Sequence, residues 1–139
     1  MKYLRTGLFI LTAACAAQAW CAPVGEEAQV AACIEEAARV FKIDPLPLAL
    51  LRQVEAGAVG MTSGNSNGSY DIGPMQINST WLPRLARIGI TEPMLRDDAC
   101  VNVYVAAWIF TQEFKATGDI VSAMARYHSP TPIHQQRWV

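Results

Sequence analysis

Apolar residues recur at helical spacing in two long segments of this chain, residues 26–41 and residues 98–117. Spacings of three and four place such side chains on one face, so each segment is predicted to be a helix packed on a core. The intervening residues 61–70 are rich in Ser, Asn and Gly, and they contain too few large apolar side chains to pack as a helix. A loop or a short β-hairpin is predicted there. The chain is therefore expected to be mostly α.

A second helix is expected to begin after Asp44, a favourable N-cap, with Pro45 in its first turn. It carries an apolar run up to Glu55, and we expect Gly57 and Gly60 to end it. Shorter helices are expected over residues 79–88, around Pro93, and from Asp119 to Tyr127.

The length of 139 residues allows one domain and is too short for two separate cores. An apolar stretch over residues 8–17 follows a basic start and precedes the small-x-small site Ala17-Gln18-Ala19, which predicts a signal peptide over residues 1–19. The stretch is shorter than the ~20 residues that span a bilayer, so no membrane span is expected after cleavage. An uncleaved anchor and a lipoprotein signal at Cys15 are the alternatives. Residues 20–139 are then a single exported domain.

Cleavage would remove two basic residues and change the formal charge from −1 to −3, so no basic surface for nucleic acid is expected. Three cysteines would remain in an oxidising compartment. Cys33 and Cys100 are the expected disulfide pair, and the long loop they close would contribute about 4 kcal/mol. Cys21 is left unpaired. No metal site is expected, because His128 and His134 are the only histidines and no ligand spacing completes a set.

The strongest functional signal comes from Glu55 together with residues 73–78, about twenty residues later in the chain. The apolar neighbours Val54 and Ala56 should partly desolvate the carboxyl group, which would raise its pKa and suit it to general acid catalysis. Gln76 and Asn78 offer amide groups of the kind that bind sugar hydroxyls. Two residues apart, they would face the same side of an extended strand.

The string Gly73-Pro74-Met75-Gln76-Ile77-Asn78 resembles the Gly-Leu-Met-Gln-Ile-Asn signature of the soluble-lytic-transglycosylase-like domain, with Pro74 at the leucine position. The longer string over residues 67–82 is similar to the small transglycosylases that accompany conjugation, type IV and type III secretion and pilus systems. The resemblance covers roughly Cys33 to Tyr127. It implies a single lysozyme-like domain of the goose-type/transglycosylase class, mostly α, with a small β or loop element over the cleft.

The resemblance also implies a periplasmic enzyme that acts on peptidoglycan glycan strands without a cofactor. Glu55 would be the catalytic acid and then the base, leaving a 1,6-anhydromuramyl end. The family needs no second carboxylate, and Asp71 is expected to bond within its own turn. A lysozyme-type muramidase and a non-catalytic peptidoglycan-binding assembly component are the alternatives. Components of a secretion, conjugation or pilus apparatus are the other partners that the resemblance suggests.

Five residues are expected to contact the substrate. Gln76 and Asn78 would contact the sugar, while Met75 fits a place under the sugar or in the core. Tyr127 matches the tyrosine of the family's Ala-Tyr-Asn motif, and its hydroxyl is expected to bond the catalytic carboxyl group or the C6 oxygen of the sugar. Ser63 aligns with a family serine near the scissile bond.

Two residues depart from the family's pattern. Ala56 stands where the family usually has serine, so a hydroxyl that could orient the catalytic carboxyl group is missing. His128 replaces the asparagine of the Ala-Tyr-Asn motif and alters the floor of the site. Either change could lower activity or shift its pH profile. Trp81 and Trp108 are expected to pack in the core.

Overall fold

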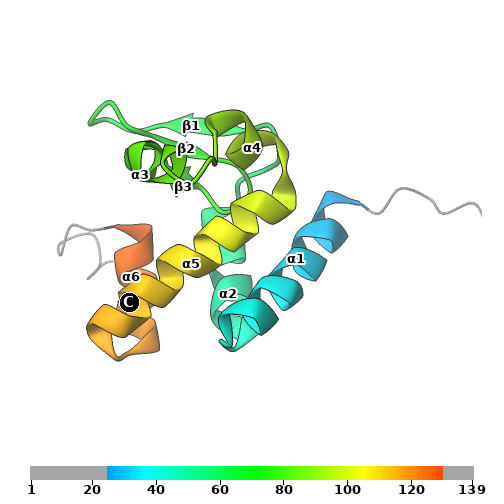
Figure 1. Ribbon diagram of the computed structural model, residues 1–139, viewed down its shortest axis with the longest axis vertical. Helices are drawn as coiled ribbons and strands as arrows, with labels where there is room; N and C mark the ends of the chain where they lie inside the picture. Colours follow the sequence, from blue (N-terminus) through cyan, green and yellow to red (C-terminus); the bar gives the residue numbers. More distant parts are fainter. Residues whose placement is uncertain (1–24, 130–139) are drawn as a thin grey trace, which may run out of the picture.

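Helix α5, Ala99–Thr117, runs through the middle of the computed structural model, which describes residues 25–129 (Figure 1). Asp98 caps it, because its side chain accepts hydrogen bonds from the backbone N–H groups of Cys100 and Val101. Gly118, with φ 69°, ends it in the left-handed conformation. The predicted signal peptide and Cys21 lie outside the described residues. Helix α5 is the element on which the rest of the domain is assembled.

Three further helices pack along this central helix or against one another: α1, Glu26–Phe41; α2, Pro45–Glu55; and α6, Ile120–His128. Two of them begin after a capping aspartate, since Asp44 accepts a hydrogen bond from the Leu46 N–H before α2 and Asp119 accepts one from the Ser122 N–H before α6. The predicted end of α2 is wrong. The helix ends at Glu55, before either glycine, because Ala56 takes the left-handed conformation with φ 48°.

A small antiparallel sheet in the order β1-β2-β3 lies at one end of α5, together with the short helices α3 and α4 (Figure 1). Ser63 pairs with Asp71 across the first two strands, and Asp71 pairs with Asn78 across the next two. The hairpin expected near residues 61–70 is confirmed. The bounds are β1, Thr62–Gly64; β2, Tyr70–Ile72; β3, Ile77–Asn78; the 3-10 helix Ser79–Trp81; α3, Leu82–Ala86; and α4, Glu92–Asp97.

Asn102 of α5 links the β2–β3 turn to this helix through hydrogen bonds. Its fully buried side chain donates hydrogen bonds to the carbonyls of Ile72 and Leu95, and it accepts one from the Met75 N–H. Gly73 turns at φ +71° beside this amide, where a Cβ would overlap the amide nitrogen and lie 2.6 Å from the Leu95 carbonyl. The turn that carries the candidate sugar-binding residues is therefore held by α5.

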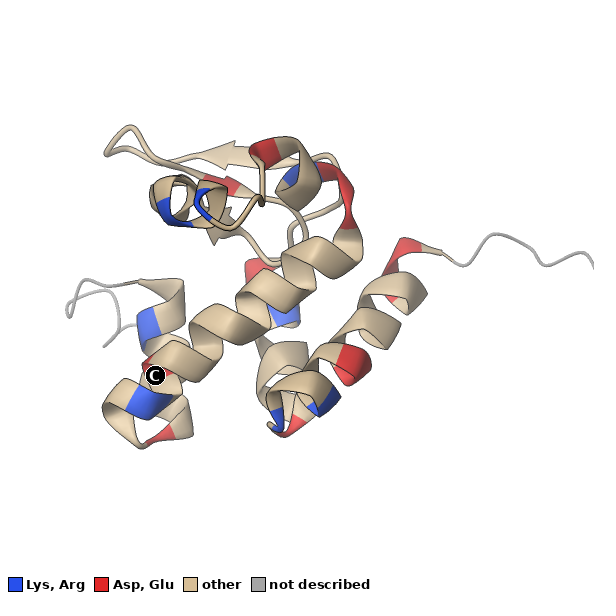
Figure 2. Ribbon diagram, viewed as in Figure 1, with Lys and Arg blue, Asp and Glu red and all other residues tan. Residues whose placement is uncertain are grey.

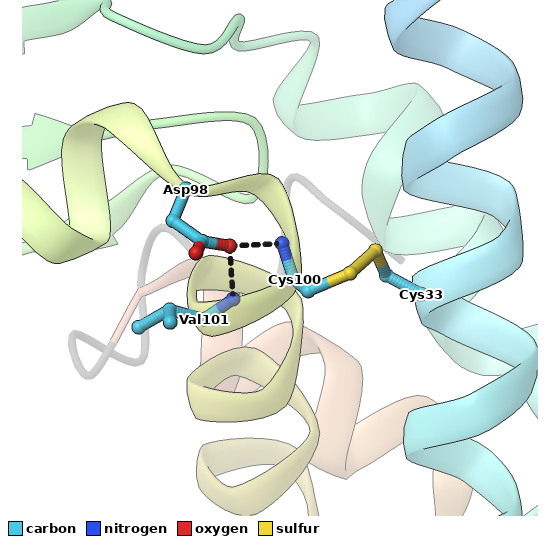
Figure 3. Close-up of a disulfide and its surroundings, with 4 residues drawn as sticks. All are labelled: Cys33, Asp98, Cys100 and Val101. Carbon is cyan, nitrogen blue, oxygen red and sulfur yellow. Dashed lines mark hydrogen bonds between the residues drawn. A yellow bond between two sulfur atoms is a disulfide. The ribbon is translucent and has the colours of Figure 1, made fainter. Parts of the chain in front are cut away.

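The predicted disulfide joins Cys33 of α1 to Cys100 in the first turn of α5 (Figure 3). The two cysteines are 67 residues apart in sequence. A loop of this length corresponds to about 4 kcal/mol of stabilisation in the chain-entropy model. The bridge holds together the two longest helices of the domain.

Trp81 and Trp108 are partly buried against the core, and their rings meet edge to face with centroids 5.5 Å apart. The Arg84 guanidinium lies over the Trp108 ring, 4.6 Å from its centroid. The tryptophans therefore have the packing role expected for them, at the edge of the core.

Within residues 25–129, no helix is long and apolar enough to cross a bilayer. Acidic and basic residues are scattered over the described elements, without a stripe of basic residues (Figure 2).

Candidate active site

A cavity of about 750 Å³ opens between the hairpin region and the helices α5 and α6. Glu55 lies in it at the end of α2, and most of the other lining groups are amides, hydroxyls and aromatic rings. Such a lining offers many donors and acceptors for a polar ligand with apolar faces. The lining residues include Asn65, Asn67, Ser69, Asp71, Gln76, Asn78, Thr80, Trp81, Ile109, Glu113, Arg126, Tyr127 and His128.

The side chain of Glu55 is 11% exposed, although it carries an ionisable group. His128 Nδ1, at the end of α6, lies 3.0 Å from Glu55 Oε1. Burial raises the pKa of the Glu55 carboxyl group, contact with His128 partly offsets the increase, and the charge of Asp71 adds to it. A carboxyl group with a raised pKa keeps its proton at higher pH than an ordinary glutamate, as a general acid requires.

Gln76 lies in a turn rather than in a strand, so the predicted extended geometry is wrong for this residue. Its backbone has φ +49°, and its Nε2 donates a hydrogen bond of 2.8 Å to the Gly73 carbonyl. Asn78 does lie in β3. Both side chains nevertheless line the cavity. Both amides can therefore contact a ligand that occupies the cavity.

Asn78 and Asp71 belong to one hydrogen-bond network beside the cavity. Asn78 Nδ2 donates to Asp71 Oδ1 at 2.7 Å and to Ser69 Oγ at 3.1 Å, while its Oδ1 accepts from the Thr80 N–H. The other oxygen of Asp71 accepts a hydrogen bond of 3.0 Å from Asn65. Both oxygens of Asp71 thus hold the sheet in shape, but they bond to the β1–β2 loop and to β3 rather than within the residue's own turn as expected.

Tyr127 lines the cavity, but its hydroxyl makes a different bond from the one expected. It donates to the Met75 carbonyl at 2.8 Å, and no bond to Glu55 is formed. Burial raises the pKa of this phenol well above its usual value, so it remains a donor. The Met75 side chain is fully buried, which favours its core role over sugar contact. Ser63 lies in β1 and is not among the residues that line the cavity.

One charged pair at the cavity is not predicted from the sequence. Arg126 Nε donates to Glu113 Oε2 at 2.6 Å, joining α6 to α5. The side chain of Glu113 is only 18% exposed. The only signal that could have found it is the meeting of two helices, which a local pattern does not specify. Among residues 25–129, no cluster of three His, Cys, Asp or Glu side chains could hold a metal ion.

A family model of the transglycosylase SLT domain matches residues 32–138, most of the 139-residue chain. The chain belongs to the transglycosylase SLT domain family. This match confirms the family resemblance, and the mostly helical structure with its small sheet agrees with a lysozyme-like SLT domain. Glu55, the β2–β3 turn and Tyr127 all lie within the matched part of the SLT domain.

Several curated proteins are similar to this SLT domain. Invasion protein IagB of Salmonella typhimurium is 36% identical over 100 residues, which cover 71% of this chain and 62% of IagB. Protein IpgF of Shigella flexneri is 31% identical over 62% of this chain and 59% of its own length. A peptidoglycan-binding-like protein of Escherichia coli O157:H7 is 28% identical over 76% of this chain and 68% of its own. The chain spans about three fifths of the first two relatives.

Proposed function

We propose that this SLT domain is a peptidoglycan lytic transglycosylase and that Glu55 is its catalytic residue. The observation that carries the proposal is the Glu55 carboxyl group itself, 11% exposed and with a raised pKa at a polar cavity of about 750 Å³. Family membership supports the reaction class. The scissile bond is the β-1,4 bond from N-acetylmuramic acid to N-acetylglucosamine.

The reaction needs one group that acts first as an acid and then as a base. Glu55 gives its proton to the glycosidic oxygen as the bond from that oxygen to muramyl C1 breaks. The C6 hydroxyl of the same sugar then attacks C1, and its proton passes to Glu55, which restores the starting carboxyl group. No water is consumed. Because the nucleophile belongs to the substrate, its effective concentration is already high.

The cavity supplies groups suited to a glycan strand. Gln76, Asn78 and Trp81 are among its lining residues. Aromatic faces pack on the apolar faces of sugars while amides bond hydroxyl and N-acetyl groups. We assign substrate contact to Gln76, Asn78 and Tyr127 on this basis.

Mass spectrometry of soluble products tests the proposal directly. The purified protein, Glu55→Gln and Glu36→Gln are each incubated with peptidoglycan sacculi. Glu36 is a matched control because the same substitution is made on an exposed part of α1, where Glu36 pairs with Arg39. We expect anhydromuramyl products from the parent and from Glu36→Gln, and none from Glu55→Gln. Equal product from Glu55→Gln and the parent would refute the assignment of Glu55.

The same spectra separate the two alternatives. Reducing muramyl ends, heavier by one water, would identify a muramidase, which needs a second group to activate that water. Asp71 lines the cavity, but both of its oxygens already accept amide hydrogen bonds. Binding to sacculi without any product would identify a non-catalytic peptidoglycan-binding component.

We further propose that the protein acts in the periplasm, where it opens the wall locally for a secretion, conjugation or pilus apparatus. The names of two relatives, an invasion protein and a peptidoglycan-binding-like protein, support this setting. Export would depend on the predicted signal peptide. Fractionation of cells that produce the full chain is expected to place the processed protein in the periplasm, and retention in the cytoplasm would contradict the proposal.

A further inference from the structure

The β2–β3 turn is bonded to three helices. Asn102 of α5 accepts a hydrogen bond from the Met75 N–H, and the Tyr127 hydroxyl of α6 donates one to the Met75 carbonyl. Arg52 of α2 supplies the third link, because its Nη1 donates to the Pro74 carbonyl at 3.4 Å. Among these three helices, α2 is the one that carries the candidate acid. The third link therefore joins the turn directly to the helix of the acid.

The Arg52 side chain lies one turn before the acid and is only 12% exposed. Its Nη2 pairs with Glu27, in the first turn of α1, while its Nε is buried without a hydrogen-bond partner within residues 25–129. A guanidinium group presents its donors in a rigid planar fork. The pair with Glu27 on one side therefore also sets the direction in which Nη1 meets the turn.

The backbone that follows α2 meets the same turn at a second point. A Cβ on Gly57 would overlap the Gly73 carbonyl oxygen and would lie 2.5 Å from Gln76 Nε2. Gln76 Nε2 itself donates to that carbonyl. The end of α2 and the turn are thus in direct contact on both sides of Glu55 in the sequence, at Arg52 and at Gly57.

The spacing between α2 and the turn matters for the proposed reaction. Glu55 must come within about 2.6–3.2 Å of the glycosidic oxygen to transfer its proton. The sugar, however, is bound by amides on the turn and on β3, which are different elements from α2. A displacement of about 1 Å at such a site can cost roughly 100-fold in rate. A bond between the helix of the acid and the turn of Gln76 limits such a displacement.

We propose that Arg52 is a positioning residue that fixes the separation between Glu55 and the sugar-binding amide of Gln76. This inference rests on the proposed function of Glu55. Arg52 is not among the residues that line the cavity of the acid, and it lines a separate hollow of about 410 Å³ instead. It therefore contacts neither the sugar nor a reacting atom, and it acts through the Pro74 carbonyl.

The chain offers a matched pair of variants. Arg52→Met removes the guanidinium group and keeps an unbranched apolar stem that fills irregular space well. Arg39→Met is the control, because Arg39 also lies in the last turn of its helix and also pairs with a glutamate of α1, Glu36. Both substitutions remove one positive charge and one ion pair, and they differ in the link to the turn.

Steady-state kinetics on soluble glycan strands compare the two variants. We expect kcat to fall about 10- to 100-fold in Arg52→Met. KM should change by less than about threefold, because the amides that bind the sugar remain on the turn and on β3. Arg39→Met should keep both constants of the parent. Equal kcat values in Arg52→Met and Arg39→Met would overturn the proposal.

A second measurement does not depend on activity. Hydrogen exchange followed by NMR reports on the Gln76 N–H, which donates to the Gly73 carbonyl at 3.1 Å. In Arg52→Met we expect this amide to exchange about tenfold faster, as the loss of one hydrogen bond predicts. Amides in the middle of α5 should keep the exchange rates of the parent. Equal acceleration of both sets would indicate a general loss of stability and would overturn the positioning role.

The two measurements separate the possible failures. If the parent gives no cleavage product but Gln76 alone exchanges faster in Arg52→Met, the proposed function is refuted while the link from Arg52 to the turn stands. If the parent is active and Arg52→Met has an unchanged kcat, the positioning role is overturned while the proposed function stands.

Discussion

Replacement of Asn102 by alanine is expected to remove the main polar link between α5 and the β2–β3 turn. The fully buried side chain makes three hydrogen bonds of 2.8 to 2.9 Å, to the Ile72 and Leu95 carbonyls and from the Met75 N–H. Each buried group left without its partner costs about 1–3 kcal/mol. Because water can enter the space left by the amide and satisfy part of this loss, we expect Asn102→Ala to lower the free energy of unfolding by about 3–5 kcal/mol.

Urea unfolding followed by tryptophan fluorescence measures this change. A loss of this size lowers the urea midpoint by roughly 2 M at an ordinary slope. The matched control is Thr111→Val, also in α5, which removes a single hydrogen bond of 2.7 Å to the Ala107 carbonyl within the same helix. The control should lose less than about 1 kcal/mol. Equal losses in Asn102→Ala and Thr111→Val would refute the reasoning, because the turn would then be held by packing alone.

Two further predictions concern the disulfide and the β2–β3 turn. Replacement of Cys33 and Cys100 by serine is expected to lower the free energy of unfolding by about 4 kcal/mol, because a loop of 67 residues is no longer closed. Unfolding of the parent with and without a thiol reductant checks this value, and an unchanged midpoint on reduction would contradict it. Gly73→Ala should lose both stability and activity because its Cβ overlaps the Asn102 amide, whereas Gly64→Ala should be tolerated in activity assays because its Cβ meets no atom within 4 Å. Comparable activity in the two alanine variants would show that the turn can move.

The helices could be predicted because their signals are local. The apolar spacing of α1 and the capping residue before α5 lie within the elements that they specify. The end of α2 could not be found in this way. Ala56 takes the left-handed conformation that glycine normally supplies, and Gln76 does so too in the β2–β3 turn. Gly57, next to Ala56, packs directly against this turn, where a Cβ would lie 2.2 Å from the Gly73 carbonyl and 2.5 Å from Gln76 Nε2, and no local pattern shows this close approach.

Glu55 is the candidate acid in both the sequence and the structure, but the structure gives a different reason for its burial. Val54 was expected to desolvate Glu55, yet it is 49% exposed. Among the groups that contact the carboxyl group is His128, which is 73 residues away in sequence. The Tyr127 hydroxyl likewise donates a hydrogen bond to the carbonyl of Met75, which is 52 residues away. Sequence spacing and resemblance identified these residues, whereas their hydrogen-bond partners depend on how α6 packs against the rest of the domain.

The endings of α2 and α6 at Glu55 and His128 also shape the electric field in the cleft. The carbonyl end of a helix carries a partial negative charge of roughly half an elementary charge, and here the last residues of two helices line one cavity. Their combined potential favours positive charge within the cavity. Glycosidic cleavage passes through an oxocarbenium-like carbon that bears such a charge. The backbone itself would therefore stabilise the transition state, and no side-chain substitution would remove that contribution while both helices end where they do.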